Sequence, residues 1–261
     1  MYLASSLIAL ASLTAAAPAS RSAAACDQSA LFTAANAFIA AQTAGKTDAL
    51  TPMLASSATY MQNNKKGDLK TGILSKALKL DYNRTITDTT LCASYTEMIS
   101  TGGPYVIGAQ ILHSADGSQV TSIDTMVATT GDWAFNVQST YTHIAAETWG
   151  DLPTAQRSSR DVLKAAADAY LDRWSNSSSV NAVPWGTPCE RVEGGMYVSP
   201  SCKVGVPTSG SASMKNSNRR YVIDEVVGSI DVFCAFGGSM PDSHEFRLES
   251  GKLRYVHTIT V

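Results

Sequence analysis

Two histidines near the C-terminus have the type and spacing for proton-transfer chemistry. His244 and His257 lie on either side of Ser250-Gly251, a turn signal between two β-rich runs. If the two runs pair symmetrically about this turn, His244 lies directly opposite His257. Histidine changes its charge near neutral pH, so a facing pair predicts general acid–base work. For each histidine taken alone, the alternative is a core side chain satisfied by a backbone carbonyl.

Asp224 is the carboxylate that could act as a base beside them. Alternation along the predicted strand Arg219 to Asp224 places Val222 and Asp224 on one face, and Tyr221 and Ile223 on the other. If the first pair faces an apolar interior, burial raises the pKa of Asp224 and suits it to remove a proton next to a carbonyl. The alternative is a carboxylate that caps the turn after the strand.

Side chains that could hold a substrate carboxylate lie earlier in the second half. Arg191 could grip two oxygens at once, and an ion pair with Glu190 or Glu193 that stiffens the loop is the alternative. One residue of the Arg219-Arg220 pair should point inward by alternation. The candidate substrate-binding residues are Arg191, Arg220, Tyr221, which could also hold an enolate charge, and Trp185, as an apolar wall or lid.

Motifs of other enzyme classes are absent from the sequence. There is no Gly-x-Ser-x-Gly elbow, no P-loop and no Gly-x-Gly-x-x-Gly after a predicted strand, and no Cys or His pair has zinc-ligand spacing. We therefore expect neither a nucleotide or flavin cofactor nor a metal ion. The 261-residue chain carries 20 basic and 22 acidic residues, a balance that argues against a nucleic acid as partner.

The N-terminal sequence indicates the secretory pathway. Residues 1–19 combine an apolar run with the small-x-small site Ala17-Pro18-Ala19. This predicts a cleaved signal peptide rather than a stable membrane anchor, since a span needs about 20 apolar residues. Asn83 and Asn176 begin N-glycosylation sequons, which matter only in that pathway. We expect a protein that is secreted or held in the secretory lumen.

The five cysteines fit the same oxidising compartment. Cys189 and Cys202 flank a Gly- and Pro-rich loop that one disulfide would close. Cys26 could pair with Cys92 and so join the first helix to the first sheet region. The odd count leaves Cys234, which lies in an apolar run and is expected to be a small buried side chain.

Hydrophobic periodicity predicts an α+β fold in two halves. In the first half, residues 26–150, helical spacing from Gln28 to Ala44 precedes β-rich runs separated by Asp-Gly and Gly-Asp turn signals, the last from Trp133 to Tyr141. In the second half, residues 155–261, a helical stripe from Ser158 to Trp174 precedes two closing hairpins. One elaborated domain and two small fused halves both remain open.

The second half also resembles a group of secreted fungal proteins with a ketosteroid-isomerase-like (NTF2/SnoaL-like) fold. The resemblance covers residues 161–261. It lies in the run Cys189 to Gly195 with Cys202, in the run Arg219 to Glu225, and in the closing runs Pro241 to Arg247 and Arg254 to Thr258. It implies a cone in which helices pack on a curved antiparallel sheet.

The group occurs in fungal polyketide pathways, and some members are linked to the dimerisation and ring closure of maleic-anhydride monomers to maleidrides. The resemblance therefore implies a cyclase or isomerase without a redox cofactor, whose partner is a small apolar acid or anhydride. We expect Asp224 or His257 to be its base. A non-catalytic secreted binding protein or effector with the same cone is the alternative. A homodimer and pathway partner proteins both stay open.

Overall fold

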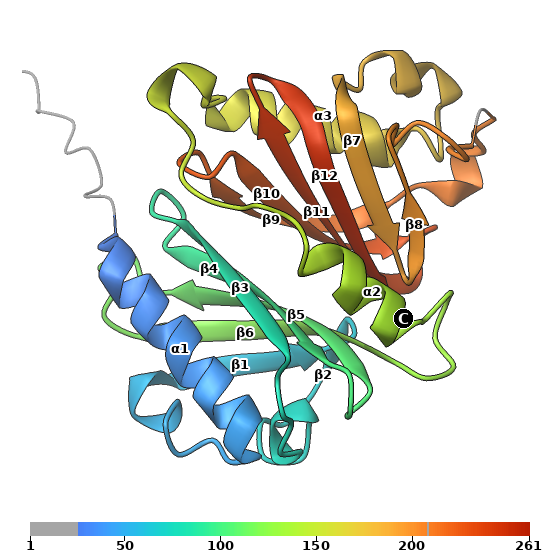
Figure 1. Ribbon diagram of the computed structural model, residues 1–261. Helices are drawn as coiled ribbons and strands as arrows, with labels where there is room; N and C mark the ends of the chain where they lie inside the picture. Colours follow the sequence, from blue (N-terminus) through green and yellow to red (C-terminus); the bar gives the residue numbers. More distant parts are fainter. Residues whose placement is uncertain (1–25, 208) are drawn as a thin grey trace, which may run out of the picture.

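Two six-stranded sheets of the same strand order build the protein. The computed structural model describes residues 26–207 and 209–261, so the expected signal peptide, residues 1–19, lies outside the described part. The first sheet has the order β2-β1-β6-β5-β4-β3, and the second has the order β8-β7-β12-β11-β10-β9 (Figure 1). In each sheet the first long strand runs parallel to the last strand, and the other pairings are antiparallel. This repeated topology confirms the expected α+β fold and, of the two alternatives left open, favours two fused halves of one plan.

The first half consists of helix α1 (Gln28–Ala44) and the sheet on which it packs. Asp27 begins the helix by accepting a hydrogen bond from the Ser29 backbone N–H, and Gly45 ends it in the left-handed conformation at φ 65°. Phe38 and Ala41 of α1 are fully buried against the sheet. The strands are β1 (Leu54–Gln62), β2 (Lys65–Lys66), β3 (Tyr82–Asp88), β4 (Ala93–Ser100), β5 (Tyr105–His113) and β6 (Val120–Thr129).

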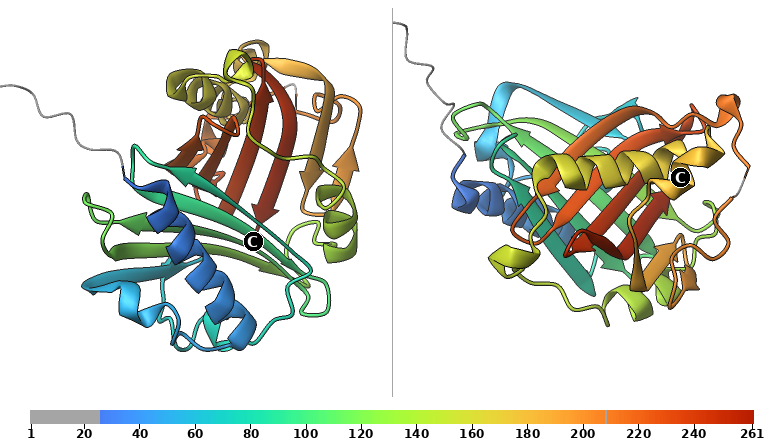
Figure 2. Two further views of the ribbon diagram at one scale, coloured as in Figure 1. Left: turned by 60° about the vertical axis from the view of Figure 1, so that its left-hand side comes forward. Right: turned by 90° about the horizontal axis from the view of Figure 1, so that it is seen from above.

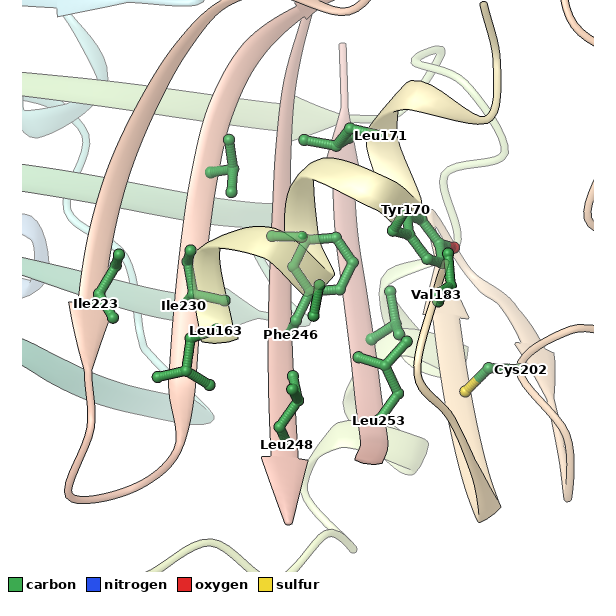
Figure 3. Packing of buried hydrophobic residues seen from close by; sticks show 14 of the residues in the cluster. Leu163, Tyr170, Leu171, Val183, Cys202, Ile223, Ile230, Phe246, Leu248 and Leu253 are labelled. Atoms are coloured by element: carbon green, nitrogen blue, oxygen red, sulfur yellow. The ribbon is translucent and has the colours of Figure 1, made fainter. Parts of the chain in front are cut away.

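The second half repeats this plan with helix α3 (Arg160–Asp172), which lies across the outer face of its sheet (Figure 2). Leu163 and Tyr170 of α3 pack on Ile230 and Phe246 of the sheet (Figure 3). The predicted helical stripe and both closing hairpins are thus present. The strands are β7 (Trp185–Glu193), β8 (Met196–Val198), β9 (Ser217–Asp224), β10 (Ser229–Phe236), β11 (Met240–Glu249) and β12 (Lys252–Thr260).

The connection between the halves differs from its prediction. The run from Trp133 to Tyr141, expected as a strand, forms a turn followed by helix α2 (Val137–Ile144). Asn136 caps this helix by accepting from the Ser139 N–H, and the helix packs beside β7 and β8. Capping and tertiary contact outweigh a short β-rich pattern here. Short 3-10 turns lie at Thr51–Met53, Ile73–Ser75, Thr154–Gln156, Ser177–Asn181 and Ala212–Met214.

The sheets pack face to face, with α1 and α3 on the outside (Figures 1 and 2). Apolar side chains from both halves share one cluster between the sheets, where the rings of Tyr95 and Phe233 meet edge to face at 6.0 Å. Each sheet therefore has two buried faces, one toward its own helix and one toward the other sheet. Strand alternation decides which face a candidate residue occupies.

The cysteines pair as expected. Disulfides join Cys26 to Cys92 and Cys189 to Cys202, and Cys234 is a free, buried thiol. Disulfides of this kind are typical of proteins from oxidising compartments. Among the helices within the described ranges, none has the length and apolar character needed to cross a membrane.

Candidate functional site

The two candidate histidines lie on opposite faces of the second sheet. In the β11–β12 pair, His244 is opposite Thr258, and Glu245 is opposite His257. A bulge just before the turn shifts the register by one residue, and such a shift turns side chains to the other face. The predicted pair of facing histidines is therefore wrong. His244 faces α3, whereas His257 faces the first sheet.

On the α3 side, His244 lines a cavity of about 790 Å³. Its walls are formed by Trp174, which follows the end of α3, by Arg191 on β7, by Met240 on β11 and by the loop after Cys202. The volume lies within the usual range of small-molecule sites, roughly 300–1,000 Å³. A ligand could therefore contact His244, a histidine with 1% of its surface exposed.

Asp242 holds His244 from one side. Its Oδ2 lies 2.6 Å from Nδ1 of His244 without forming a regular hydrogen bond, while its Oδ1 accepts from the Thr260 hydroxyl at 2.7 Å. Nε2 of His244 has no partner among the described residues. The pair resembles a base whose orientation is fixed by a buried carboxylate. Asp242 was not among the predicted residues, although alternation along β11 places it on the face of His244.

Further polar groups on this side of the sheet lack partners. The indole N–H of Trp174, in the cavity wall, and the hydroxyl of Thr258, the cross-strand neighbour of His244, are buried and bond to nothing in the described ranges. Buried polar atoms normally find a partner, and a ligand is one explanation for those that do not. They could stabilise an oxyanion beside His244.

The mouth of the cavity is apolar. Val204, Met196 and Trp133 line it and keep 61%, 47% and 46% of their surfaces exposed. Met214 and Met240 add to this rim. Large apolar side chains gathered at one opening mark a binding site more often than a random surface. The arrangement suits a ligand with an apolar body and a polar end.

His257 belongs instead to an ionic cluster buried between the sheets. Its Nδ1 lies 3.0 Å from Oε2 of Glu97, and its Nε2 lies 2.8 Å from Oε2 of Glu147. Arg84 forms a bidentate pair with Glu245 and lies 3.3 Å from Glu97. Three carboxylates and two cations thus join the first half, the connection and the second half. We assign His257 to this contact and withdraw the expectation that it is the base.

The charges of this cluster set the pKa values of its members. Burial alone would lower the pKa of His257, but the negative charges of Glu147 and Glu97 outweigh it and raise the pKa to about 10. Burial alone would raise the pKa of Glu97, but the charges of His257 and Arg84 outweigh it and lower the pKa. His257 is therefore an imidazolium at neutral pH, a poor proton acceptor and a good ion-pair partner.

The raised pKa of His257 predicts a pH-dependent stability. The folded protein keeps this proton while the unfolded chain, with a pKa of about 6.5, loses it, so the stabilisation is complete below that pH and falls as the pH rises toward 10. Between pH 6.5 and 8 we expect a loss approaching about 1.4 kcal/mol per pH unit. Urea unfolding of the wild type and of His257→Asn over this range measures it. A variant slope as steep as the wild-type slope would contradict this origin.

Asp224 also lies between the sheets. Its Oδ2 accepts from the Thr87 N–H of the first half at 2.9 Å, and its Oδ1 accepts from the backbone N–H groups of Val226 and Val227. Val222, on the same face, packs between the sheets, whereas Ile223 faces α3. The face of β9 with Val222 and Asp224 therefore meets the other sheet, and the face with Ile223 meets α3. Asp224 caps the turn after β9, which was the alternative interpretation.

The expected substrate-binding residues divide between the cavity and other places. Arg191 lines the cavity, donates to the carbonyls of Cys202 and Val204, and pairs with Glu193 at 3.3 Å. It therefore anchors the disulfide loop that forms one wall of the cavity.

The other three lie away from the cavity. Arg220 bonds Asp124 and Asn64 of the first half at 2.8 and 2.7 Å, and so connects the two sheets. The Tyr221 hydroxyl donates to Asp168 on α3. The Trp185 indole donates to the Val180 carbonyl and packs on the α3 core rather than forming a lid.

Two buried clusters have the donor atoms for a metal ion. One is Cys234, Asp242 and His244, and the other is Glu97, Glu245 and His257. In the second, Arg84 already supplies a positive charge. In the first, burial raises the pKa of the Cys234 thiol, which disfavours the thiolate that a metal would need. The expectation of no metal stays a prediction.

Both predicted glycosylation sites have accessible side chains. Asn83 is exposed on β3, and Asn176 is exposed just before the 3-10 turn at Ser177–Asn181. Attachment of a glycan at either asparagine stays a prediction.

Comparisons with known proteins match parts of the chain. Residues 156–260 match a family profile described as a domain of unknown function (DUF8021), and no curated protein matches. An NTF2-like protein of unknown function from Shewanella baltica is 12% identical over 39% of this chain and 94% of its own, with a TM-score of 0.31. PrhC from Penicillium brasilianum is 12% identical over 39% of this chain and 82% of its own, with a TM-score of 0.27. An NTF2-like protein from Bacteroides fragilis is 9% identical over 85% of this chain and 94% of its own, with a TM-score of 0.21.

Proposed function

We propose that the cavity of the second half is the active site of an isomerase or cyclase that works by general base catalysis. The observation that carries this proposal is His244: its Nε2 is unpartnered at a cavity, and a buried carboxylate lies against its Nδ1. Such a histidine can accept a proton from a bound substrate and return it. Asp242 is its positioning residue.

The reaction needs no net oxidant or reductant. Nε2 of His244 accepts a proton from the alkyl carbon joined to the ring alkene, and the electron pair of that C–H bond moves through the alkene onto the carbonyl oxygen as a dienolate. The Thr258 hydroxyl, which lacks a partner on the strand beside His244, could hold that charge. In an isomerisation, His244 returns the proton to a different carbon of this anion. In a coupling, the anion carbon adds to the alkene of a second molecule, and His244 returns the proton to the new carbanion that this addition creates.

The substrate class follows from the resemblance and the cavity together. Anhydride-type polyketide monomers have an activated carbonyl and an apolar chain, which match the polar inner wall and the apolar rim. We therefore propose coupling or ring closure of such monomers, as in maleidride formation. The two disulfides support a secreted protein or one of the secretory lumen.

The test is turnover of alkyl-substituted maleic anhydride monomers in D2O, followed by mass spectrometry. We expect deuterium at the alkyl carbon joined to the ring alkene and, in addition, coupled or cyclised products. Deuterium above the protein-free rate supports base catalysis even without coupling. If monomers bind but exchange no faster than in buffer, the protein is a binding protein and the catalytic proposal is wrong.

A further inference from the structure

Arg173 is a buried charge without a partner. It is the C-cap residue of α3 and has no exposed surface, and none of its three side-chain nitrogens has a hydrogen-bond acceptor among the described residues. Its guanidinium carbon lies 3.5 Å from the ring centroid of Tyr170 and 3.6 Å from that of Trp174. The two aromatic rings are thus the main neighbours of this charge, which cation–π attraction stabilises only in part.

Nearby acidic groups do not neutralise Arg173. Burial lowers the pKa of this guanidinium, and the charge of Glu193 acts against that shift. Glu193, however, is paired with Arg191. An isolated buried cation is costly to a protein, and one that is retained calls for an explanation.

The position of Arg173 relative to the cavity explains why this buried charge is retained. The Trp174 ring that stacks on the guanidinium is part of the cavity wall, so the charge lies one aromatic ring behind that wall. At roughly 7 Å and an effective dielectric of about 20, a unit charge favours an anionic group over a neutral one by more than about tenfold. The Trp174 N–H, which lacks a partner, could donate to the same anion.

We propose that the cavity selects an amphiphile with a carboxylate, whose charge is balanced by Arg173 through the Trp174 wall. The apolar rim of Trp133, Met196 and Val204 would hold the rest of the molecule. This inference rests on the proposed function only in using the same cavity. Beyond the proposed function, it assigns a negative charge to the ligand and names Arg173 as the residue that recognises this charge.

The test compares decanoate with 1-decanol by isothermal titration calorimetry at pH 7. We expect the wild type to prefer decanoate, and Arg173→Met to weaken decanoate binding by about tenfold or more while 1-decanol binding stays unchanged. Because Arg173→Met removes an unpaired buried charge, its melting temperature without ligand should equal or exceed that of the wild type. Arg173→Gln, which keeps a planar polar end, serves if the methionine variant does not fold.

Arg219→Met is the matched control, because Arg219 carries the same charge in the same half but pairs with Asp168 and Asp172 outside the cavity. We expect it to keep the preference for decanoate. The inference would be overturned if the wild type bound decanoate and 1-decanol equally, or bound neither at millimolar concentration. It would also be overturned if Arg173→Met were less stable than the wild type and lost affinity for both ligands to the same extent. Deuterium exchange without a decanoate preference would leave the proposed function standing, and the reverse result would leave this inference standing.

Discussion

His244→Asn is expected to reduce the rate of monomer turnover by about 100- to 10,000-fold, the range of a lost general base. The asparagine amide can take the place of Nδ1 beside Asp242, so the cavity wall is kept while the group at Nε2 is lost. Binding of decanoate should change little. Initial rates of deuterium incorporation, measured at a temperature where circular dichroism shows the variant folded, give the result.

Two further variants separate a base from a structural histidine. Asp242→Asn should lower the rate less and shift its pH profile, because Asp242 acts only by holding and polarising the imidazole. His257→Asn should retain the turnover of the folded protein, since His257 lies between the sheets. Loss of turnover in His257→Asn together with full turnover in His244→Asn would contradict the assignment of the base.

Arg84→Met is expected to lower the free energy of unfolding by about 3–5 kcal/mol at pH 7. The substitution leaves Glu97 and Glu245, whose side chains are at most 1% exposed, to share the single positive charge of His257. It also removes the cation stacked 3.5 Å from the ring centroid of Trp149. Urea unfolding at pH 7 measures the change.

The ion pair between the exposed Lys79 and the half-buried Asp81 provides the control for Arg84. The Lys79 side chain is 90% exposed and its charge is screened by solvent, so Lys79→Met should change the free energy of unfolding far less than Arg84→Met does. The double variant Arg84→Met with Glu245→Gln should recover part of the loss, because it removes a stranded charge as well as its partner. A loss in Arg84→Met no larger than that in Lys79→Met would show that the cluster does not hold the halves together.

Local features of this fold could be predicted because local residues cause them. Helix α1 follows from its apolar spacing and from Gly45, the hairpins follow from their turn signals, and the loop between Cys189 and Cys202 suggests its disulfide. Alternation also places Asp224 with Val222, as the structure has it.

The site could not be predicted to the same extent, because it depends on long-range packing. Alternation shows which residues share a face but not whether that face meets α3 or the other sheet, and this decided against Asp224 and His257. One bulge separated His244 from His257. The missing partners of Arg173 have no sequence signal, since they follow from what the tertiary fold leaves out.

The location of the ligand site is tested most directly by methyl NMR of the methionines during a titration with decanoate. Met196, Met214 and Met240 line the cavity, whereas Met98 packs under α1 and Met126 lies between the sheets. We expect the first three methyl signals to shift in a saturable manner while those of Met98 and Met126 stay in place. Shifts confined to Met98 or Met126 would contradict the assignment of the functional site to the second half's cavity.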